Sequence, residues 1–328
     1  MANGDTEGPD RSRRRSEELR ARRERRRRQL RRRRLGALAA LVLAIAAVIA
    51  GVGLLAGGGG RGLSRIAAQS STTHPHGGGA GEGGGSGPVR NATPQPGWRP
   101  YTGPVPILEY HVLGAAPADA PYPEIYVSRR DFHRQMDWLE AHGYQAVTLE
   151  QVERAWYHGA TLPPKPVVLS FDDGYRPDFT YALPELRRHG WAGLLNLKTE
   201  GSGLYESNVR AMIAAGWELA AHTIHHLDLT ELDPEQLHEE VAGSRAILRR
   251  EYGVPVRDFC YPAGDFDETV VTAVKAAGYT AATAEIPGYA TRGRPYELAR
   301  FEILGSSGVA GMAEDLHTGE GTTGEIGA

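Results

Sequence analysis

The sequence predicts an α/β fold whose parallel strands curve toward a barrel. Over residues 99–317, apolar segments typical of buried strands alternate with segments typical of helices, and the connections between them are short. About eight such strands in one body favour a barrel over an open sheet. The expected strands cover residues 105–111, 144–148, 165–171, 191–198, 217–222, 256–262, 279–285 and 298–303.

Helix ends are marked between these strands. Ser128 and Asp131 form a capping box ahead of an apolar helical pattern. Asp233 followed by Pro234 supplies an N-cap and a first-turn proline. Glycines in the left-handed conformation commonly end helices, and three are expected to do so here: Gly190, Gly216 and Gly278.

A basic segment precedes a long uncharged one at the start of the chain. Residues 11–34 contain fifteen arginines, whereas residues 35–56 contain no charged residue. An apolar run of this length can span a bilayer as a helix, and arginines beside it keep that side in the cytoplasm. We therefore expect a basic cytoplasmic tail at 1–34, a transmembrane anchor at 35–56, and a body outside the cytoplasm at the cell membrane.

A cleaved signal peptide is the competing interpretation of this segment, and it would release a secreted protein. Ala67 and Ala68 lie near a suitable processing point, but the apolar run is longer than a usual signal core and Arg61 follows it. The arginine run could instead bind nucleic acid. Membrane topology and anionic lipid explain it with fewer assumptions, so no nucleic-acid partner is expected.

Composition separates the anchor from the body. Residues 57–98 are rich in Gly, Ser, Thr and Pro, which predicts a flexible linker, and residues 318–328 are expected to form a flexible tail. The whole chain has a net charge of −3 although its first 34 residues are strongly basic, so the remainder is acidic and unsuited to binding polyanions. Cys260 is the only cysteine, which excludes an intramolecular disulfide.

Polar side chains directly follow two of the expected strands. The apolar run at 167–171 ends in Asp172 and Asp173, and catalytic groups of α/β barrels lie at such carboxyl ends. Taken alone, this stretch also fits an ordinary Asp-Gly turn. A later strand ends in His222, with His226 four residues on. Two such histidines and one carboxylate make an open facial set of metal ligands.

Three motifs in this order resemble the polysaccharide deacetylase family, also called the NodB homology family or carbohydrate esterase family 4. They are Ser-Phe-Asp-Asp-Gly-Tyr at 170–175, His-Thr-Ile-His-His-Leu-Asp-Leu at 222–229 and Phe-Cys-Tyr-Pro-Ala-Gly at 259–264. The resemblance covers about residues 104–316. It implies a distorted, incomplete (β/α) barrel and a metal-dependent hydrolase that removes N-acetyl groups from an amino-sugar polysaccharide. The early strand that ends in Tyr110 and His111 resembles the branch of poly-N-acetylglucosamine deacetylases.

The resemblance implies a role for each matching residue. The implied set comprises the general base Asp172, the general acid His111, the metal ligands Asp173, His222 and His226, and the groove residues Tyr261, Pro262 and Ala263, of which Ala263 offers its N–H to the oxyanion. One divalent ion is expected, with zinc preferred, and an acetylated polysaccharide is the expected partner. His225 stands where the family usually has a small residue and is the weaker ligand candidate.

Two departures from the family pattern bear on the site. Cys260 stands where many members have an arginine that braces the catalytic base. The C-terminal Leu316-His317 departs from the family's Leu-x-His motif, and the resemblance to the poly-N-acetylglucosamine deacetylase branch, whose acid comes from the start of the domain, implies His111 for this role. Two alternatives stay open. The site could hydrolyse an O-acetyl ester, or the protein could bind a wall glycan with little turnover.

Overall fold

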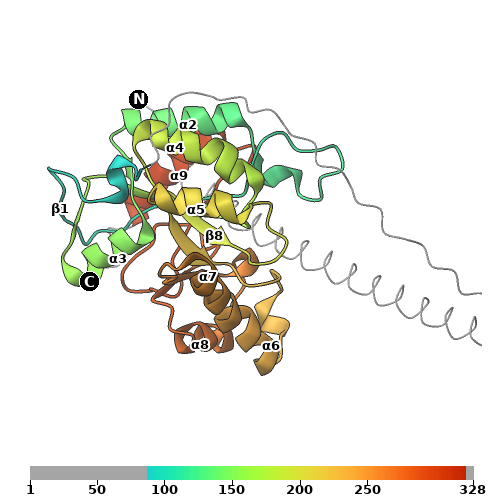
Figure 1. Ribbon diagram of the computed structural model, residues 1–328. Helices are drawn as coiled ribbons and strands as arrows, with labels where there is room; N and C mark the ends of the chain where they lie inside the picture. Colours follow the sequence, from blue (N-terminus) through green and yellow to red (C-terminus); the bar gives the residue numbers. More distant parts are fainter. Residues whose placement is uncertain (1–86, 323–328) are drawn as a thin grey trace, which may run out of the picture. The chain divides into compact units, whose positions relative to one another are not determined.

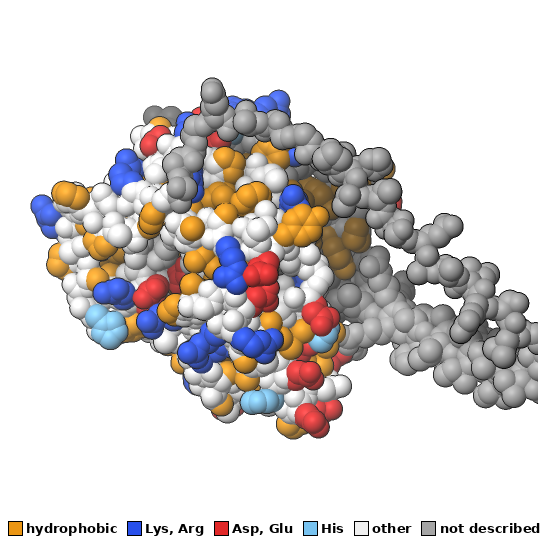
Figure 2. All heavy atoms as spheres, viewed as in Figure 1, with side chains coloured by type: hydrophobic (Ala, Val, Ile, Leu, Met, Phe, Trp, Pro, Cys, Tyr) orange, Lys and Arg blue, Asp and Glu red, His pale blue; other side chains and the backbone are white. Residues whose placement is uncertain are grey.

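The computed structural model describes residues 87–322, with side chains described through residue 317 (Figure 1; Figure 2 shows the side chains by type in the same view). The predicted basic tail, transmembrane anchor and most of the linker fall in residues 1–86, outside the described residues, as does the end of the predicted tail. Within residues 87–322, no helix has both the length and the apolar character needed to cross a membrane.

The main sheet confirms the predicted strands. Its order is β11-β10-β9-β8-β7-β2-β12, β5 pairs with the first residues of β7, and all of these pairings are parallel. Each strand falls inside its predicted range or extends it by a single residue. The strands are β2 (Ile107–Tyr110), β5 (Gln145–Ala146), β7 (Pro166–Asp172), β8 (Leu194–Leu197), β9 (Glu218–Ala221), β10 (Asp258–Cys260), β11 (Ala281–Thr283) and β12 (Phe301–Glu302).

The sheet curls into an incomplete barrel. Its two end strands, β11 and β12, are not paired along their length. They are joined through one parallel bridge between Thr283 and Leu298, and Leu298 lies just before β12. There the N–H of Leu298 donates to the carbonyl of Ala282 at 2.9 Å, and the N–H of Ala284 donates to the carbonyl of Leu298 at 3.0 Å. The described body is therefore an α/β half-barrel of parallel strands, as the resemblance implied.

Helices surround the strands in two groups. Figure 1 shows α2, α4 and α9 on one side of the barrel and α6, α7 and α8 on the other. The helices are α2 (Arg129–Ala141), α3 (Leu149–His158), α4 (Leu183–His189), α5 (Glu206–Ala214), α6 (Pro234–His238), α7 (Ser244–Tyr252), α8 (Glu268–Ala276) and α9 (Gly308–Thr322). Two short strand pairs lie outside the main sheet: β1 (Arg99–Pro100) with β6 (Thr161–Leu162), and β3 (Val112–Leu113) with β4 (Tyr126–Val127). Because α9 continues to residue 322, the folded body extends past the predicted boundary at 317.

The predicted helix ends are confirmed. Ser128 Oγ accepts a hydrogen bond from the N–H of Asp131 at 3.1 Å at the start of α2. Asp233 caps α6 with its side chain, and Pro234 follows as the first helical residue. The three glycines that end α4, α5 and α8 all have positive φ: Gly190 at 75°, Gly216 at 94° and Gly278 at 82°.

Alternation along the strands separates an outer core from the barrel interior. On β7, Leu169 and Phe171 pack outward with helix residues such as Phe132. The intervening residues Ser170 and Asp172 share the opposite face, because successive side chains of a strand point to opposite sides. In-register pairing puts Glu109 opposite Ser170 and Asn196 opposite Asp172. The carboxyl half of the barrel interior is consequently polar.

Residues just before the predicted body also pack on it. The N–H of Val89 donates to the carbonyl of Ala215 at 2.9 Å. Asn91 is fully buried, and its side-chain amide donates to the carbonyl of Ala146 at 3.1 Å. Trp98 is buried as well. The described end of the predicted 57–98 linker is thus part of the fold, which starts before residue 99.

Substitution of Gly216 tests whether residues 89–98 pack on the body. A Cβ at residue 216 would collide with the Cβ of Ala92, and the positive φ adds strain for any other residue. We expect Gly216→Ala to lower the free energy of unfolding by about 3 kcal/mol, from strain plus overpacking. Gly253→Ala is the matched control, because its φ is 70° but nothing lies within 4 Å of a built Cβ. Denaturant unfolding should show a control loss of about 1 kcal/mol, and equal losses would contradict the docking.

Candidate active site

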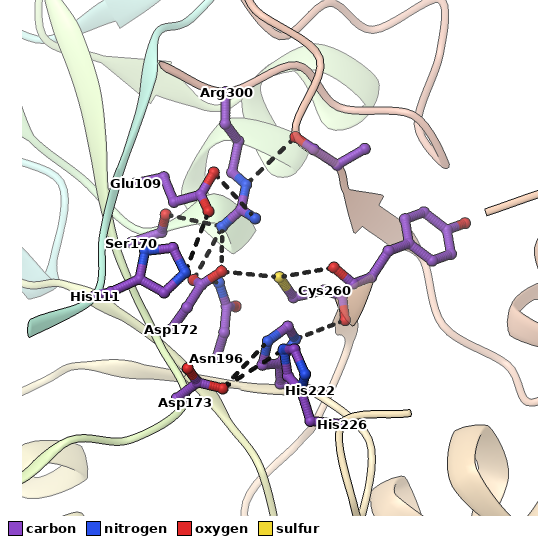
Figure 3. A network of polar contacts seen from close by, with 12 residues as sticks. Glu109, His111, Ser170, Asp172, Asp173, Asn196, His222, His226, Cys260 and Arg300 are labelled. Atoms are coloured by element: carbon purple, nitrogen blue, oxygen red, sulfur yellow. Dashed lines mark hydrogen bonds and ion pairs between the residues drawn. The ribbon is translucent and has the colours of Figure 1, made fainter. Parts of the chain in front are cut away.

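Polar side chains from several strands meet inside the carboxyl end of the half-barrel (Figure 3). Asp172 is the last residue of β7, and His222 directly follows β9. Both are almost completely buried, at 1% exposure each. In an α/β barrel this end carries the loops that differ between enzymes, whereas the other end stabilises the fold. The structure therefore collects the predicted site residues at the functional end.

Asp173, His222 and His226 form a compact triad. Asp173 Oδ1 lies 3.8 Å from His222 Nε2 and 3.6 Å from His226 Nε2. The two imidazole rings are 4.7 Å apart between centroids and nearly perpendicular. Their ligand atoms all lie within 4.8 Å of one another, so one ion could be shared by all three.

The orientation of His222 fits a metal ligand. Its Nδ1 lies 2.8 Å from the backbone carbonyl of Cys260. As a donor to that carbonyl, Nδ1 carries the proton and leaves the Nε2 lone pair directed toward Asp173. Burial lowers the pKa of His222, which favours the neutral ring that binds a metal. A carboxylate with two neutral imidazoles is a donor set that suits a divalent ion such as zinc.

The loops that carry and surround the triad have unusual backbone conformations. Among the described residues, four that are not glycine have positive φ: Asp173 at 71°, Thr223 at 66°, His226 at 58° and Ala263 at 55°. All four lie in the loops that follow β7, β9 and β10. Such conformations cost about 1–3 kcal/mol each and gather at functional sites, where surrounding contacts hold them. Here Thr223 Oγ1 accepts the N–H of His226 at 2.9 Å.

His225 turns away from the triad. Its Nδ1 lies 2.5 Å from Glu240 Oε1, and its side chain is 46% exposed. Glu240 Oε2 also accepts the backbone N–H groups of Ile224 and His225, at 2.9 and 3.0 Å. The hydrogen bond to Glu240 raises the pKa of His225. This histidine therefore anchors the loop to the segment 239–243 and lies outside the ligand set.

Asp172 is held from three sides. Arg300 Nη1 lies 2.9 Å from each carboxylate oxygen, and Asn196 Nδ2 donates to Oδ1 at 2.7 Å. The thiol of Cys260 lies 3.3 Å from Oδ2. Burial by itself would raise the pKa of Asp172, but the charge of Arg300 and of the nearby histidines outweighs it and holds the pKa below its usual range. The carboxylate is therefore ionised.

Arg300 and Asn196 were not singled out by the sequence. The sequence pattern raised the concern that Cys260 replaces an arginine that braces the base, and the structure supplies a guanidinium from just before β12 instead. Each of these polar residues interrupts an apolar strand pattern, at 298–303 and at 191–198. A polar residue inside a buried strand must find a partner, and that signal could have found both.

His111 lies beside the base, next to a second buried carboxyl group. The ligand atoms of His111, Glu109 and Asp172 all lie within 4.8 Å of one another. His111 Nε2 is 3.6 Å from Glu109 Oε1, and Arg300 Nη2 is 3.3 Å from Glu109 Oε2. Burial raises the pKa of Glu109 well above its usual range, although Arg300 acts in the opposite direction. Base and acid candidates thus come from adjacent strands, β7 and β2.

The groove residues are only partly placed as expected. Ala263 lies in the left-handed turn after β10, which packs so tightly that a Cβ at Gly264 would collide with the backbone of Glu285. The side chain of Tyr261 is fully buried, with its hydroxyl 3.1 Å from the carbonyl of Tyr296, and Pro262 is buried too. Tyr261 therefore packs in the outer core and does not line a groove. His317 lies far from the site, against Trp138 of α2.

Fold and site together define an α/β hydrolytic domain with its polar groups at the strand carboxyl ends. Residues 159–282 match the family model for polysaccharide deacetylase. The chain is 28% identical over 214 residues to the “Putative polysaccharide deacetylase YxkH” of Bacillus subtilis strain 168, which covers 64% of this chain and 74% of that one. These findings confirm the resemblance to polysaccharide deacetylases, and the family model matches over residues 159–282.

Two further relatives extend the comparison. The chain is 37% identical over 92 residues to the poly-beta-1,6-N-acetyl-D-glucosamine N-deacetylase of Escherichia coli K12, covering 28% of this chain and 13% of that much longer protein. The solved Streptococcus pyogenes deacetylase PplD, in complex with acetate, superposes with a TM-score of 0.61 over 67% of this chain and 99% of that one. At 22% identity, this second likeness shows a shared fold.

Removing Arg300 tests its importance. We expect Arg300→Met to lower the free energy of unfolding by about 3–5 kcal/mol, because the ionised Asp172 would stay buried without its cation. Guanidinium unfolding followed by tryptophan fluorescence measures the loss. Arg294→Met is the control, because this side chain is 74% exposed and only weakly paired with Glu297. If both variants lost the same stability, Arg300 would not be the main support of the buried carboxylates.

Proposed function

We propose that this protein is a metal-dependent hydrolase that removes N-acetyl groups from an amino-sugar polysaccharide outside the cell. The observation that carries the proposal is the position of Asp172, an ionised carboxylate next to the triad of Asp173, His222 and His226. A base beside a three-ligand cation site is what hydrolysis of an unactivated amide requires. The match to the polysaccharide deacetylase family supports this reaction type.

Each residue of the site has a separate proposed role. Asp173, His222 and His226 would hold the divalent ion, with zinc preferred, which when bound would supply polarisation of the acetyl carbonyl and a lowered pKa of water. Asp172 takes the proton from the attacking water. Asn196 and Arg300 keep its carboxylate in one orientation.

Protonation of the leaving amine falls to His111. It directly follows β2, the strand next to the one that ends in Asp172, so it approaches the substrate from a different side than the base. Its Nε2 lies 3.6 Å from Glu109 Oε1, a contact that orients the ring beside the base. The backbone N–H of Ala263, in its left-handed turn, is the proposed donor to the oxyanion.

The substrate class follows from the relatives. One similar protein is named for deacetylating poly-β-1,6-N-acetyl-D-glucosamine, and we propose a polymer of N-acetylated amino sugars for this protein as well. Such a polymer lies outside the cytoplasm, which agrees with the uncharged segment at 35–56 acting as an anchor. Protease added to intact cells should release the body, whereas a mature protein in the medium beginning near Gln69 would favour a cleaved signal.

Neighbouring histidines provide a matched test of the metal site. His226→Ala should lower bound zinc sharply, because it removes one of three ligands. His225→Ala should keep zinc near one ion per chain, because His225 points to Glu240. Metal content of the purified proteins, measured by plasma mass spectrometry, checks both. Equal zinc content in the two variants would sink the ligand assignment.

Two substrates separate the base from the acid. Asp172→Asn should lower turnover on both an N-acetylated oligosaccharide and an activated aryl acetate by about 10²-fold or more, because both need a base. His111→Ala should affect the oligosaccharide far more than the aryl acetate, since a good leaving group needs no proton. Acetate release and aryl absorbance measure the two rates. An equal loss on both substrates would mean that His111 positions the substrate.

A further inference from the structure

Two large hydrophobic side chains are exposed in the described part of the chain, and they lie at opposite ends of the barrel. Tyr205 is 65% exposed and precedes α5, which follows β8, so it lies at the carboxyl end with the active site. Tyr157 is 46% exposed and borders Arg257 and Thr280, which precede β10 and β11. An exposed aromatic ring beside an active site is a common means of binding a substrate.

The loop that carries Tyr205 is tied to both loops of the metal triad. Gly203 donates its N–H to the carbonyl of Gly174, next to Asp173, at 2.9 Å. Thr199 donates its N–H to the carbonyl of Thr223, next to His222, at 3.1 Å. Tyr205 is thereby fixed relative to the reacting centre.

The ring itself is also held. The guanidinium of Arg176, three residues beyond Asp173, lies 4.5 Å from the centroid of the Tyr205 ring. Asn208 Oδ1 accepts the backbone N–H of Tyr205 at 3.0 Å. A ring with a cation on one face and 65% exposure offers its other face to solvent. This preorganisation reduces the entropy lost when a ligand stacks on it.

Lys198 also lies beside the triad. Its Nζ lies 3.9 Å from Asp173 Oδ1, and it is the first residue after β8 on the loop that leads to Tyr205. The loops that carry the ring, the guanidinium and the ammonium are therefore the rim of the site beside the metal ligands. A chain of sugars bound at the triad would pass over this rim if it extended in that direction.

We propose that Tyr205 and Arg176 form a sugar-binding subsite for a pyranose ring next to the residue being deacetylated. The apolar C–H face of a pyranose packs on an aromatic ring, and its hydroxyl groups can accept hydrogen bonds from a guanidinium. The proposal rests on the proposed function. It makes the protein an enzyme that acts on oligomers in preference to the single sugar.

The test compares chain lengths in the full-length protein. Its substrates are the monomer and the pentamer of β-1,6-linked N-acetylglucosamine, and kcat/KM is taken from acetate release. Tyr205→Ala should lower the pentamer-to-monomer ratio of kcat/KM by about tenfold. Tyr205→Phe should keep the ratio, because the ring remains. Tyr157→Ala is the control, because Tyr157 is the exposed tyrosine at the other end of the barrel. Its pentamer-to-monomer ratio of kcat/KM should match that of the wild type.

A binding measurement separates this subsite from the proposed function. In the Asp172→Asn background, calorimetric affinity for the pentamer should fall by about tenfold with Tyr205→Ala and stay unchanged with Tyr157→Ala. If the wild type bound the pentamer but released no acetate, the proposed function would be wrong, and the measured affinities would still test the subsite. The subsite would be wrong if Tyr205→Ala changed neither the pentamer-to-monomer ratio of kcat/KM nor the affinity for the pentamer. A loss shared equally by Tyr157→Ala would overturn it too.

Discussion

The charge pairing of Arg300 with Asp172, beside the buried carboxyl group of Glu109, is the interaction on which the interior of the half-barrel depends. Two carboxyl groups from adjacent strands lie buried at its centre, and one guanidinium contacts both. Without a cation, burying either carboxylate would be strongly unfavourable. Because Arg300 arrives just before β12, the last strand of the sheet completes the site that β7 and β2 begin.

The loops after β7, β9 and β10 use that rigid interior as a support. Three of the proposed functional residues have left-handed backbone, a conformation that a free peptide avoids. Buried groups hold these turns in place: Glu240 accepts two N–H groups of the loop after β9, and the carbonyl of Cys260 orients His222. The geometry of the ligand triad is therefore set by the packing of neighbouring loops, and each ligand depends on contacts from another strand.

The same interior shows how the family's brace is rearranged. In this chain the thiol of Cys260 touches the base from β10, and the guanidinium that stabilises the charge comes from the other end of the sheet. Both side chains reach the same carboxylate because a curled sheet brings strands on either side of β7 close to the end of β7. The curvature of the barrel, rather than the position of a residue in a motif, decides which side chain fulfils this role.

Much of the fold was determined by the sequence alone. All eight predicted strands of the main sheet formed, and the predicted caps and glycine stops ended the helices, because apolar periodicity and turn chemistry act over short stretches of chain. Local patterns also singled out Asp172, Asp173, His222 and His226, which the structure brings together at the carboxyl ends of the strands. Only the tertiary structure decided that Arg300 and Asn196 hold the base, that His225 faces Glu240, that Tyr261 is buried, and that residues before 99 pack on the body. These features depend on contacts between residues far apart in the chain, which no local pattern encodes.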